Sequence, residues 1–329
     1  GGCLRTLVTG ATGFVGTALV DRLVGAGRFD VRAAVRHKVS RLPVEVESVV
    51  VGDLTPDTVW QQALAGVETI VHLAARVHVM RDTAADPLAE FRWVNARGTL
   101  NLARQAAAAG VRRFVFLSSV KVNGEGTLTP SPSSGGRVYK ESDPPAPQDA
   151  YGISKYEAEV GLREIAAETG MEVVIIRSPL VYGPGVKANF QALMRAVARG
   201  IPLPLGAIHN RRSLVALDNL VDFILTCIEH PAAANETFLV SDGEDLSTTE
   251  LIRRLARAIG RPARLIPVPT TVLMAGATLL GKRKVAARLC GSLQVDITKT
   301  RTRLNWSPPV TVDDALRATA RHFLDSSFR

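Results

Sequence analysis

The feature that most constrains the fold is a glycine-rich turn between an apolar run and an amphipathic segment near the start of the chain. Residues Thr9–Gly16 read TGATGFVG; Leu4–Thr9 are typical of a strand and Phe14–Val24 of a helix. Glycines permit a tight turn and a close approach of backbone to pyrophosphate, and the helix start supplies N–H donors and a positive dipole end. This context predicts a dinucleotide-binding turn. The alternative is a glycine-rich turn made for packing.

Short apolar runs alternate with amphipathic stretches through the first half of the 329 residues. The expected strands are Val31–Arg36, Val46–Val51, Thr69–Ala74, Phe114–Leu117 and Val173–Ile176, and the expected helices are Ala84–Ala109 and Ala150–Thr169. This order is typical of a parallel sheet covered by helices on both faces. We predict an α/β fold with a Rossmann-type doubly wound parallel sheet over residues 3–180. A smaller C-terminal α/β substrate lobe is expected over residues 181–329, with some segments returning to the first domain.

Two further segments bear on function. The loop Asn123–Pro147 is rich in Ser, Pro and Gly, and its length predicts a flexible flap over a site. The apolar run Val272–Leu280 is too short to cross a bilayer, which takes about 20 residues. Basic residues Lys282, Arg283 and Lys284 follow it. We expect a packed helix with a basic end, and the alternative is a membrane-surface anchor.

The net charge of +9 raises the question of a nucleic-acid partner. The arginines are spread over the expected helices rather than gathered in one tail, so we expect no nucleic acid. Three widely spaced cysteines and six histidines form no CxxC or HExxH spacing. We therefore expect a cytoplasmic protein with no metal site and no membrane span.

The segment Tyr151-Gly152-Ile153-Ser154-Lys155 follows the pair Ser118-Ser119. A free tyrosine has a pKa of roughly 10, too high for a base at neutral pH. A lysine four residues later on a helix lies on the same face, and its charge is expected to lower that pKa. The hydroxyl of Ser119 could share the oxygen of a substrate. These residues predict coupled transfer of a hydride and a proton.

The end of the second expected strand bears on the choice of cofactor. An acidic residue there favours NAD, whereas this chain has Arg36, which could pair with a 2′-phosphate. We favour NADP(H), with NAD(H) as the alternative; a solvated basic turn would explain Arg36 equally without a ligand. Asp53 and Leu54, after the third expected strand, are placed to meet the adenine edge.

Several motifs occur in a fixed order along the chain: TGATGFVG, GDL at Gly52–Leu54, HLAA at His72–Ala75, the serine pair, YGISK, and RSPLVYGPG at Arg177–Gly185. Together they resemble the extended short-chain dehydrogenase/reductase family, in its nucleotide-sugar epimerase, dehydratase and reductase branch. The resemblance covers nearly the whole chain. It implies a Rossmann domain, a C-terminal lobe that binds a UDP-sugar, and a homodimer in which the two long helices, Ala84–Ala109 and Ala150–Thr169, pair with those of a second copy.

The resemblance also implies a set of site residues. The catalytic residues would be Ser119, Tyr151 and Lys155. The cofactor would contact Gly10, Thr12, Gly13, Phe14, Val15, Gly16, Arg36, Asp53, Leu54, Leu73, Ala74, Ala75, Asn95, Ser118, Tyr151, Lys155 and Pro179. The substrate would contact His78, Ser119, Lys121, Asn189, Leu205 and Arg212. Roles without any ligand contact stay open: Asn95 could be a buried polar residue of a helix, Arg212 a surface charge and Lys121 a solvated charge on a loop.

Departures from the family pattern narrow the reaction. In the 4,6-dehydratases of this family, Asp-Glu follows the residue that matches Ser119. This chain has Val120 and Lys121 there, so a dehydration would lack its acid and base. We expect a UDP-4-keto-6-deoxy-N-acetylhexosamine 4-reductase of O-antigen or lipopolysaccharide biosynthesis. The alternatives are a UDP-glucose or UDP-GlcNAc 4-epimerase and, from another class, a non-catalytic dinucleotide-binding sensor.

Overall fold

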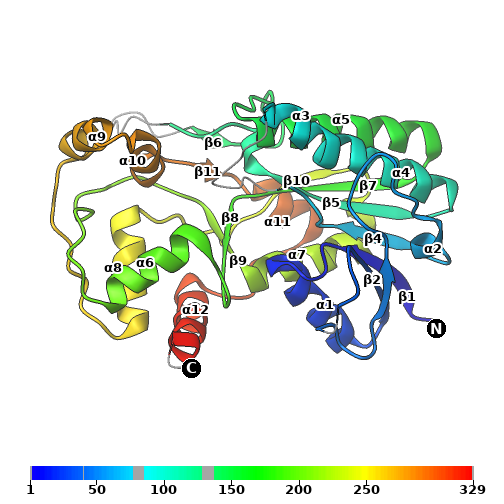
Figure 1. Ribbon diagram of the computed structural model, residues 1–329, viewed down its shortest axis with the longest axis horizontal. Helices are drawn as coiled ribbons and strands as arrows, with labels where there is room; N and C mark the ends of the chain where they lie inside the picture. The colour runs from blue at the N-terminus through cyan, green and yellow to red at the C-terminus, as the bar shows by residue number, and fades with distance from the viewer. Residues whose placement is uncertain (1, 40, 77–84, 128–136, 328–329) are drawn as a thin grey trace.

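The computed structural model describes residues 2–39, 41–76, 85–127 and 137–327 (Figure 1). Its centre is a seven-stranded sheet in the order β10-β7-β5-β4-β1-β2-β3, in which every neighbouring pair is parallel. The strands are β1 (Leu4–Thr9), β2 (Phe29–Val35), β3 (Glu47–Val50), β4 (Thr69–His72), β5 (Arg113–Ser119), β7 (Glu172–Ser178) and β10 (Thr237–Leu239). Successive strands are added on one side of β1 up to β3 and on its other side from β4 onward, so the strand order reverses between β1 and β4. This topology confirms the predicted Rossmann-type α/β fold.

Helices cover both faces of this sheet and bury two separate apolar layers. On one face lie α1 (Phe14–Ala26) and α7 (Leu217–Glu229), packed against each other. On the other lie α2 (Gln61–Leu64), α4 (Thr99–Ala108) and α5 (Ala150–Thr169). Strands buried on both faces explain the nearly continuous apolar runs of the sequence. The expected helix Ala84–Ala109 is in fact three consecutive pieces: α3 (Pro87–Phe91), the π-helix η1 (Arg92–Gly98) and α4.

The later part of the chain forms a second lobe and also returns to the sheet. The lobe packs α6 (Ala188–Ala198), α8 (Thr248–Ile259) and α12 (Val312–Ser327) around an apolar core of their own. It also holds α9 (Thr270–Leu279), α10 (Arg283–Cys290) and the parallel pair β8 (Leu180–Tyr182) and β9 (Leu214–Ala216). The strand β10 and the helices α7 and α11 (Thr298–Leu304) lie instead with the central sheet (Figure 1).

Both described ends of the predicted flap contact the second lobe. After the short 3-10 helix η2 (Val120–Val122), the chain forms β6 (Val138–Tyr139), which pairs in parallel with β11 (Gln294–Val295). A second 3-10 helix, η3 (Pro231–Ala233), follows α7. Thr127 and Ser292 exchange backbone hydrogen bonds of 3.0 and 2.9 Å. Residues 128–136 of the loop lie outside the described part of the chain. The described ends are therefore fixed by backbone pairing rather than free.

The run Val272–Leu280 is packed over part of its length. It forms most of α9, which has no fully buried residue; Leu279 is 89% and Leu280 is 77% exposed. The helix packs on α10, and its Leu273 and Met274 lie partly buried against the core of the second lobe. Among the described residues, no helix is long and apolar enough to span a membrane.

Candidate active site

The glycine turn lies where β1 meets α1, beside the end of β4. Gly10 has a φ of +66°, and a Cβ there would come within 2.8 Å of the backbone nitrogen of Ala74. A Cβ on Gly16 would lie 1.9 Å from the carbonyl oxygen of Gly10. Gly13 differs: its φ is −78°, and its Cβ would meet nothing closer than 3.4 Å. Conformation and packing therefore require Gly10 and Gly16 but not Gly13.

The absence of a side chain at Gly13 leaves the start of α1 accessible. Gly13 is the N-cap of α1, and no side chain caps the helix. The first backbone N–H groups of a helix have no partner within the helix and favour an anion. Thr12, Phe14 and Val15 belong to the same turn. These residues fit a pyrophosphate at the point where the strand order reverses, and NAD or NADP supplies such a group.

His72 joins this turn to the neighbouring loop. Its Nδ1 lies 2.6 Å from the hydroxyl of Thr9, and its Nε2 lies 2.9 Å from the hydroxyl of Thr99. The Thr9 oxygen accepts from the backbone N–H groups of Leu73 and Ala74, at 3.0 and 3.1 Å. Its proton is thus available to Nδ1, which leaves Nε2 to donate to Thr99. Burial, followed by the charge of Lys155, lowers the pKa of His72 from 6.5 to about 3, so the ring is neutral.

The structure brings Ser119, Tyr151 and Lys155 together. Ser119 ends β5, and both other residues lie on α5, which packs against β5 and η2. The Nζ of Lys155 is 5.8 Å from the centre of the Tyr151 ring, and it donates to the carbonyl oxygen of Leu117 at 3.0 Å. The Oγ of Ser119 accepts from the backbone N–H of Lys121 at 3.1 Å. The phenol and the amine therefore lie near each other on the helix that packs against the end of β5, where Ser119 lies.

The expected lowering of the Tyr151 pKa is wrong for this structure. Burial, and then the negative charge of Asp149, raises the pKa of Tyr151 to about 12. Burial also lowers the pKa of Lys155 to about 8, against a smaller opposite effect of Glu159. The physical reason is that desolvation favours the neutral form of both groups. Lys155 directs its ammonium to a backbone carbonyl, and its charge is not what dominates at Tyr151.

Lys121 lies beside Tyr151 and not in open solvent. Its Nζ is 2.6 Å from a carboxylate oxygen of Asp149 and 5.9 Å from the centre of the Tyr151 ring. The other oxygen of Asp149 accepts from the backbone N–H of Gly152 at 2.7 Å and so caps α5. Lys121 is therefore positioned by the same residue that starts the catalytic helix.

A buried ionic network behind the site was not expected from the sequence. Glu159 is fully buried; it accepts from the hydroxyl of Ser118 at 2.6 Å and pairs with Arg177 at 2.7 Å and Arg163 at 2.9 Å. Ser118 therefore directs its hydroxyl into the protein. Glu159 lies one turn after Lys155 on α5, and that spacing was the one available signal. Its partner Arg177 comes from β7, which only the sheet order brings near.

Asn95 fixes the chain that follows the HLAA motif. It is 1% exposed, and its amide bonds both the N–H and the C=O of Arg76, at 2.8 and 3.0 Å. It also lies 3.3 Å from the hydroxyl of Ser154 on α5. Ala75 precedes Arg76. Asn95 thus supports the loop after β4 from within η1; direct contact with the cofactor stays a prediction.

The residues expected around the adenosine lie at the ends of β2 and β3. Arg36 forms an ion pair of 2.8 Å with Asp53, and both side chains are about 70% exposed. Leu54 packs beside Gly98 of η1. Pro179 lies on the other side of the site, directly after β7, and accepts from the hydroxyl of Ser178 through its carbonyl at 2.8 Å.

The expected substrate residues of the second lobe are more dispersed. Arg212 donates to the carbonyl oxygens of Arg288 and Gly291, at 2.8 and 3.1 Å, and burial lowers its pKa. It is therefore not a freely solvated charge. Asn189 is exposed at the start of α6, whereas the side chain of Leu205 is 7% exposed and part of the lobe core. His78 lies outside the described residues.

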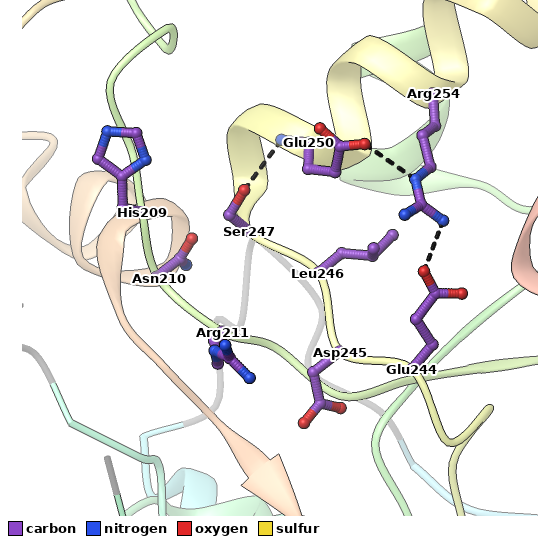
Figure 2. A pocket seen from close by; sticks show the side chains of 9 residues that line it. All are labelled: His209, Asn210, Arg211, Glu244, Asp245, Leu246, Ser247, Glu250 and Arg254. Atoms are coloured by element: carbon purple, nitrogen blue, oxygen red, sulfur yellow. Dashed lines mark hydrogen bonds and ion pairs between the residues drawn. The ribbon is translucent and has the colours of Figure 1, made fainter. Parts of the chain in front are cut away.

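Two hollows of the surface contain none of the three residues predicted to be catalytic. One, of about 320 Å³, lies in the second lobe between Asn210 and α8 (Figure 2). Its Arg254 pairs with Glu244 at 2.7 Å and Glu250 at 3.0 Å. The other, of about 670 Å³, opens between α5 and β10. No group of three or more possible metal-binding side chains is found in the described ranges.

A doubly wound sheet, a glycine turn at the first strand and a Tyr–Lys pair on the helix beside β5 are the features of an extended short-chain dehydrogenase/reductase. The chain belongs to the NAD dependent epimerase/dehydratase family, whose profile matches residues 6–241. It is thus an enzyme of that family. The family is named for its dependence on NAD, which was one of the two cofactors predicted from the sequence. Arg36 had led us to favour the other one, NADP.

Known proteins similar to this chain include several 4-epimerases. A UDP-glucose 4-epimerase of Vibrio cholerae is 50% identical over 98% of this chain and 96% of its own length. An N-acetyl-alpha-D-glucosaminyl-diphospho-ditrans,octacis-undecaprenol 4-epimerase of Escherichia coli O157:H7 is 28% identical over 97% of this chain and 95% of its own. A UDP-glucuronic acid 4-epimerase of Bacillus cereus, solved with NAD, has a TM-score of 0.77 at 20% identity, covering 98% of this chain and 99% of that one. That last likeness shows the fold.

Proposed function

We propose that the enzyme is a 4-epimerase of a hexose or N-acetylhexosamine carried by UDP. The observation that carries the proposal is the 50% identity to a UDP-glucose 4-epimerase along almost the whole chain. The site supports it because Ser119, Tyr151 and Lys155 are together at the sheet edge, beside a turn that fits a dinucleotide. The sequence had favoured a 4-reductase, which uses the same three residues.

The chemistry proposed for these residues is reversible oxidation at C4. When bound, NAD supplies an acceptor for the hydride from C4 and later returns it. Tyr151 takes the proton of the C4 hydroxyl as hydride leaves, so that a ketone forms, and gives the proton back when hydride adds to the opposite face. Ser119 donates a hydrogen bond to the C4 oxygen. Lys155 stabilises the tyrosinate between the two half-reactions.

We infer that NAD(H), rather than NADP(H), is the cofactor of this chain. The guanidinium of Arg36 is already paired with Asp53. The Asp53 carboxylate beside it would repel a 2′-phosphate, whereas it can accept a hydrogen bond from a ribose hydroxyl. Asp53, which follows β3, thus supplies the acidic group that is missing at the end of β2, where the chain has Arg36.

The test is to incubate the purified enzyme with UDP-GlcNAc, and separately with UDP-glucose, without added cofactor. We expect the C4 epimer of at least one of them by chromatography, and NAD(H) released on denaturation by mass. A Tyr151→Phe variant prepared in parallel is the control for a contaminating epimerase. No epimer, together with oxidation of NADPH when a UDP-4-keto-6-deoxy-hexosamine is supplied, would establish the reductase instead.

A further inference from the structure

The most exposed apolar side chains of the second lobe lie at the turn between α9 and α10. Leu279 and Leu280 end α9, and the chain turns at Gly281, which has a φ of +68°. Farther back on α9, Val272 is 58% exposed. We call residues 279–284 the α9–α10 tip. Figure 1 shows α9 and α10 at one end of the molecule, far from the N-terminal strands.

A cluster of positive charge follows these leucines directly. Lys282, Arg283 and Lys284 are all exposed. Within the described ranges, none of the three takes part in an ion pair, whereas surface cations such as Arg22, Arg28 and Arg92 each pair with a carboxylate. The tip thus combines two bare leucines with three cations that have no acidic partner.

The tip is attached firmly to the lobe at its other end. The last carbonyl groups of α10 accept hydrogen bonds from three buried or half-buried side chains: Thr248 and Asn210 to Leu289, at 2.5 and 3.1 Å, and Arg212 to Arg288, at 2.8 Å. A helix end held this way does not fray. The tip therefore projects from a fixed base, and its exposure is a property of the fold.

We propose that the α9–α10 tip docks the enzyme on the surface of an anionic phospholipid bilayer. Leucines that enter the boundary of the acyl chains, flanked by lysine and arginine that meet lipid phosphates, are the combination that such a surface binds. A second copy of the chain fits less well. A two-fold contact through this face would bring the same three cations of both copies together.

The experiment is co-sedimentation of the full-length enzyme with vesicles of phosphatidylglycerol and phosphatidylcholine, and with vesicles of phosphatidylcholine alone. We expect binding only to the first. The variant Lys282→Glu/Lys284→Glu should weaken binding by about tenfold or more, since each basic residue near the surface contributes about 1 kcal/mol, close to a factor of 5. The variant Leu279→Glu/Leu280→Glu should weaken binding by about tenfold or more as well, because it removes the apolar side chains that enter the bilayer.

Matched controls separate the tip from overall charge. Arg253→Glu/Arg321→Glu, on α8 and α12, changes the net charge as much as the lysine variant; Val44→Glu/Val59→Glu replaces exposed apolar residues elsewhere. Both should bind vesicles like the parent. Epimerisation of a water-soluble UDP-sugar should be unchanged in both tip variants, which shows that they fold.

Three results would overturn the proposal. They are no binding to anionic vesicles, an equal loss in the Arg253→Glu/Arg321→Glu control, and a change in the sedimentation coefficient of the vesicle-free protein on Leu279→Glu/Leu280→Glu. The last would make the tip a contact between copies. None of these results bears on the proposed epimerase activity, which is measured separately.

Discussion

Tyr151 and Lys155 lie one turn apart on α5, and burial moves the pKa of the phenol up to about 12 and that of the amine down to about 8. Burial thus shifts both groups toward their neutral forms, so that the phenol is neutral at pH 7 whereas the amine, with a pKa of about 8, is still mostly protonated. A positive charge brought to the pocket by an oxidised nicotinamide acts in the opposite sense and favours the tyrosinate. The base is thus expected to form only when the cofactor is bound and oxidised.

Replacing Tyr151 by Phe should remove the proton acceptor while leaving the fold intact. We expect the epimerisation rate to fall by about 10²–10⁴-fold, the usual contribution of a positioned acid–base group. The amount of NAD(H) that co-purifies should stay the same. Rates from coupled product detection, with urea unfolding as the check on folding, measure this; a rate above one tenth of the parent's would exclude Tyr151 as the base.

The neutral His72 should make the enzyme sensitive to acid. Its pKa is 6.5 when exposed and about 3 in the fold. Between these values the unfolded chain binds more protons than the folded one, so stability falls as the pH falls from 6.5 toward 3. Going from pH 7.5 to pH 5 should lower the free energy of unfolding by about 2 kcal/mol on account of this residue.

Urea unfolding at the two pH values tests this, with His72→Gln as the comparison. The variant should be less stable at pH 7.5, because the bonds to Thr9 and Thr99 change, but its stability should depend less on pH over this interval. An equal dependence in both proteins would mean that other groups cause it.

Sequence reasoning found residues whose chemistry is local and missed those that the fold assembles. Tyr151 and Lys155 are one helical turn apart, so their proximity could be predicted from spacing alone. Glu159 and Arg177 could not be paired in this way, because one lies on α5 and the other on β7. The direction of the Tyr151 pKa shift was also missed, since burial is a property of the packed structure.

At the scale of elements, two glycines of the turn between β1 and α1 have different roles: Gly16 is needed for packing, whereas Gly13 is expected to make room for a ligand. Gly16→Ala should destabilise the fold by roughly 2 kcal/mol or more, because its Cβ meets the Gly10 carbonyl. Gly13→Ala should change stability by less than about 1 kcal/mol, since the backbone is compatible and the space is open.

Gly13→Ala should impair cofactor binding more than stability, whereas the main effect of Gly16→Ala should be on stability. Gly13→Ala should lose the NAD(H) that co-purifies, although its thermal midpoint stays near that of the parent, because the new methyl group occupies the path of the pyrophosphate. Differential scanning calorimetry and cofactor mass analysis on the same samples measure both effects. Full cofactor retention by Gly13→Ala would place the pyrophosphate elsewhere.

The elements themselves were predictable to different degrees. Strands β1 and β4 and helix α5 follow from the apolar runs and the strand–helix alternation of the sequence. The π-helix η1 could not be predicted, because one extra residue per turn leaves no mark in a periodic pattern of Ala and Leu. Helix α9 packs on α10 and partly on the lobe core, but its apolar composition did not predict that Leu279 and Leu280 would stay exposed.

At the scale of the whole molecule, the assembly of two copies stays a prediction. The outer faces of α5 and η1 expose Val160 (37%) and Trp93 (41%) close to the helices expected to pair. Val160→Asp should therefore shift the protein toward a monomer in sedimentation velocity, while Val44→Asp, on a loop, should not. A monomeric parent protein, or no difference between the two variants, would contradict the expected pairing.

The two lobes are joined across the site by hydrogen bonds between their backbones. β6 follows from the loop after Ser119, β11 belongs to the second lobe, and the contact is extended by the Thr127–Ser292 exchange and by the bond of 2.8 Å from the Asp296 N–H to the Tyr139 carbonyl. This pairing ties the loop after the serine pair to the second lobe. An epimerase of the kind proposed here, which keeps one cofactor molecule through many turnovers, would respond only to the concentrations of its two sugars. Its direction would then be independent of how oxidised or reduced the cellular nicotinamide pool becomes.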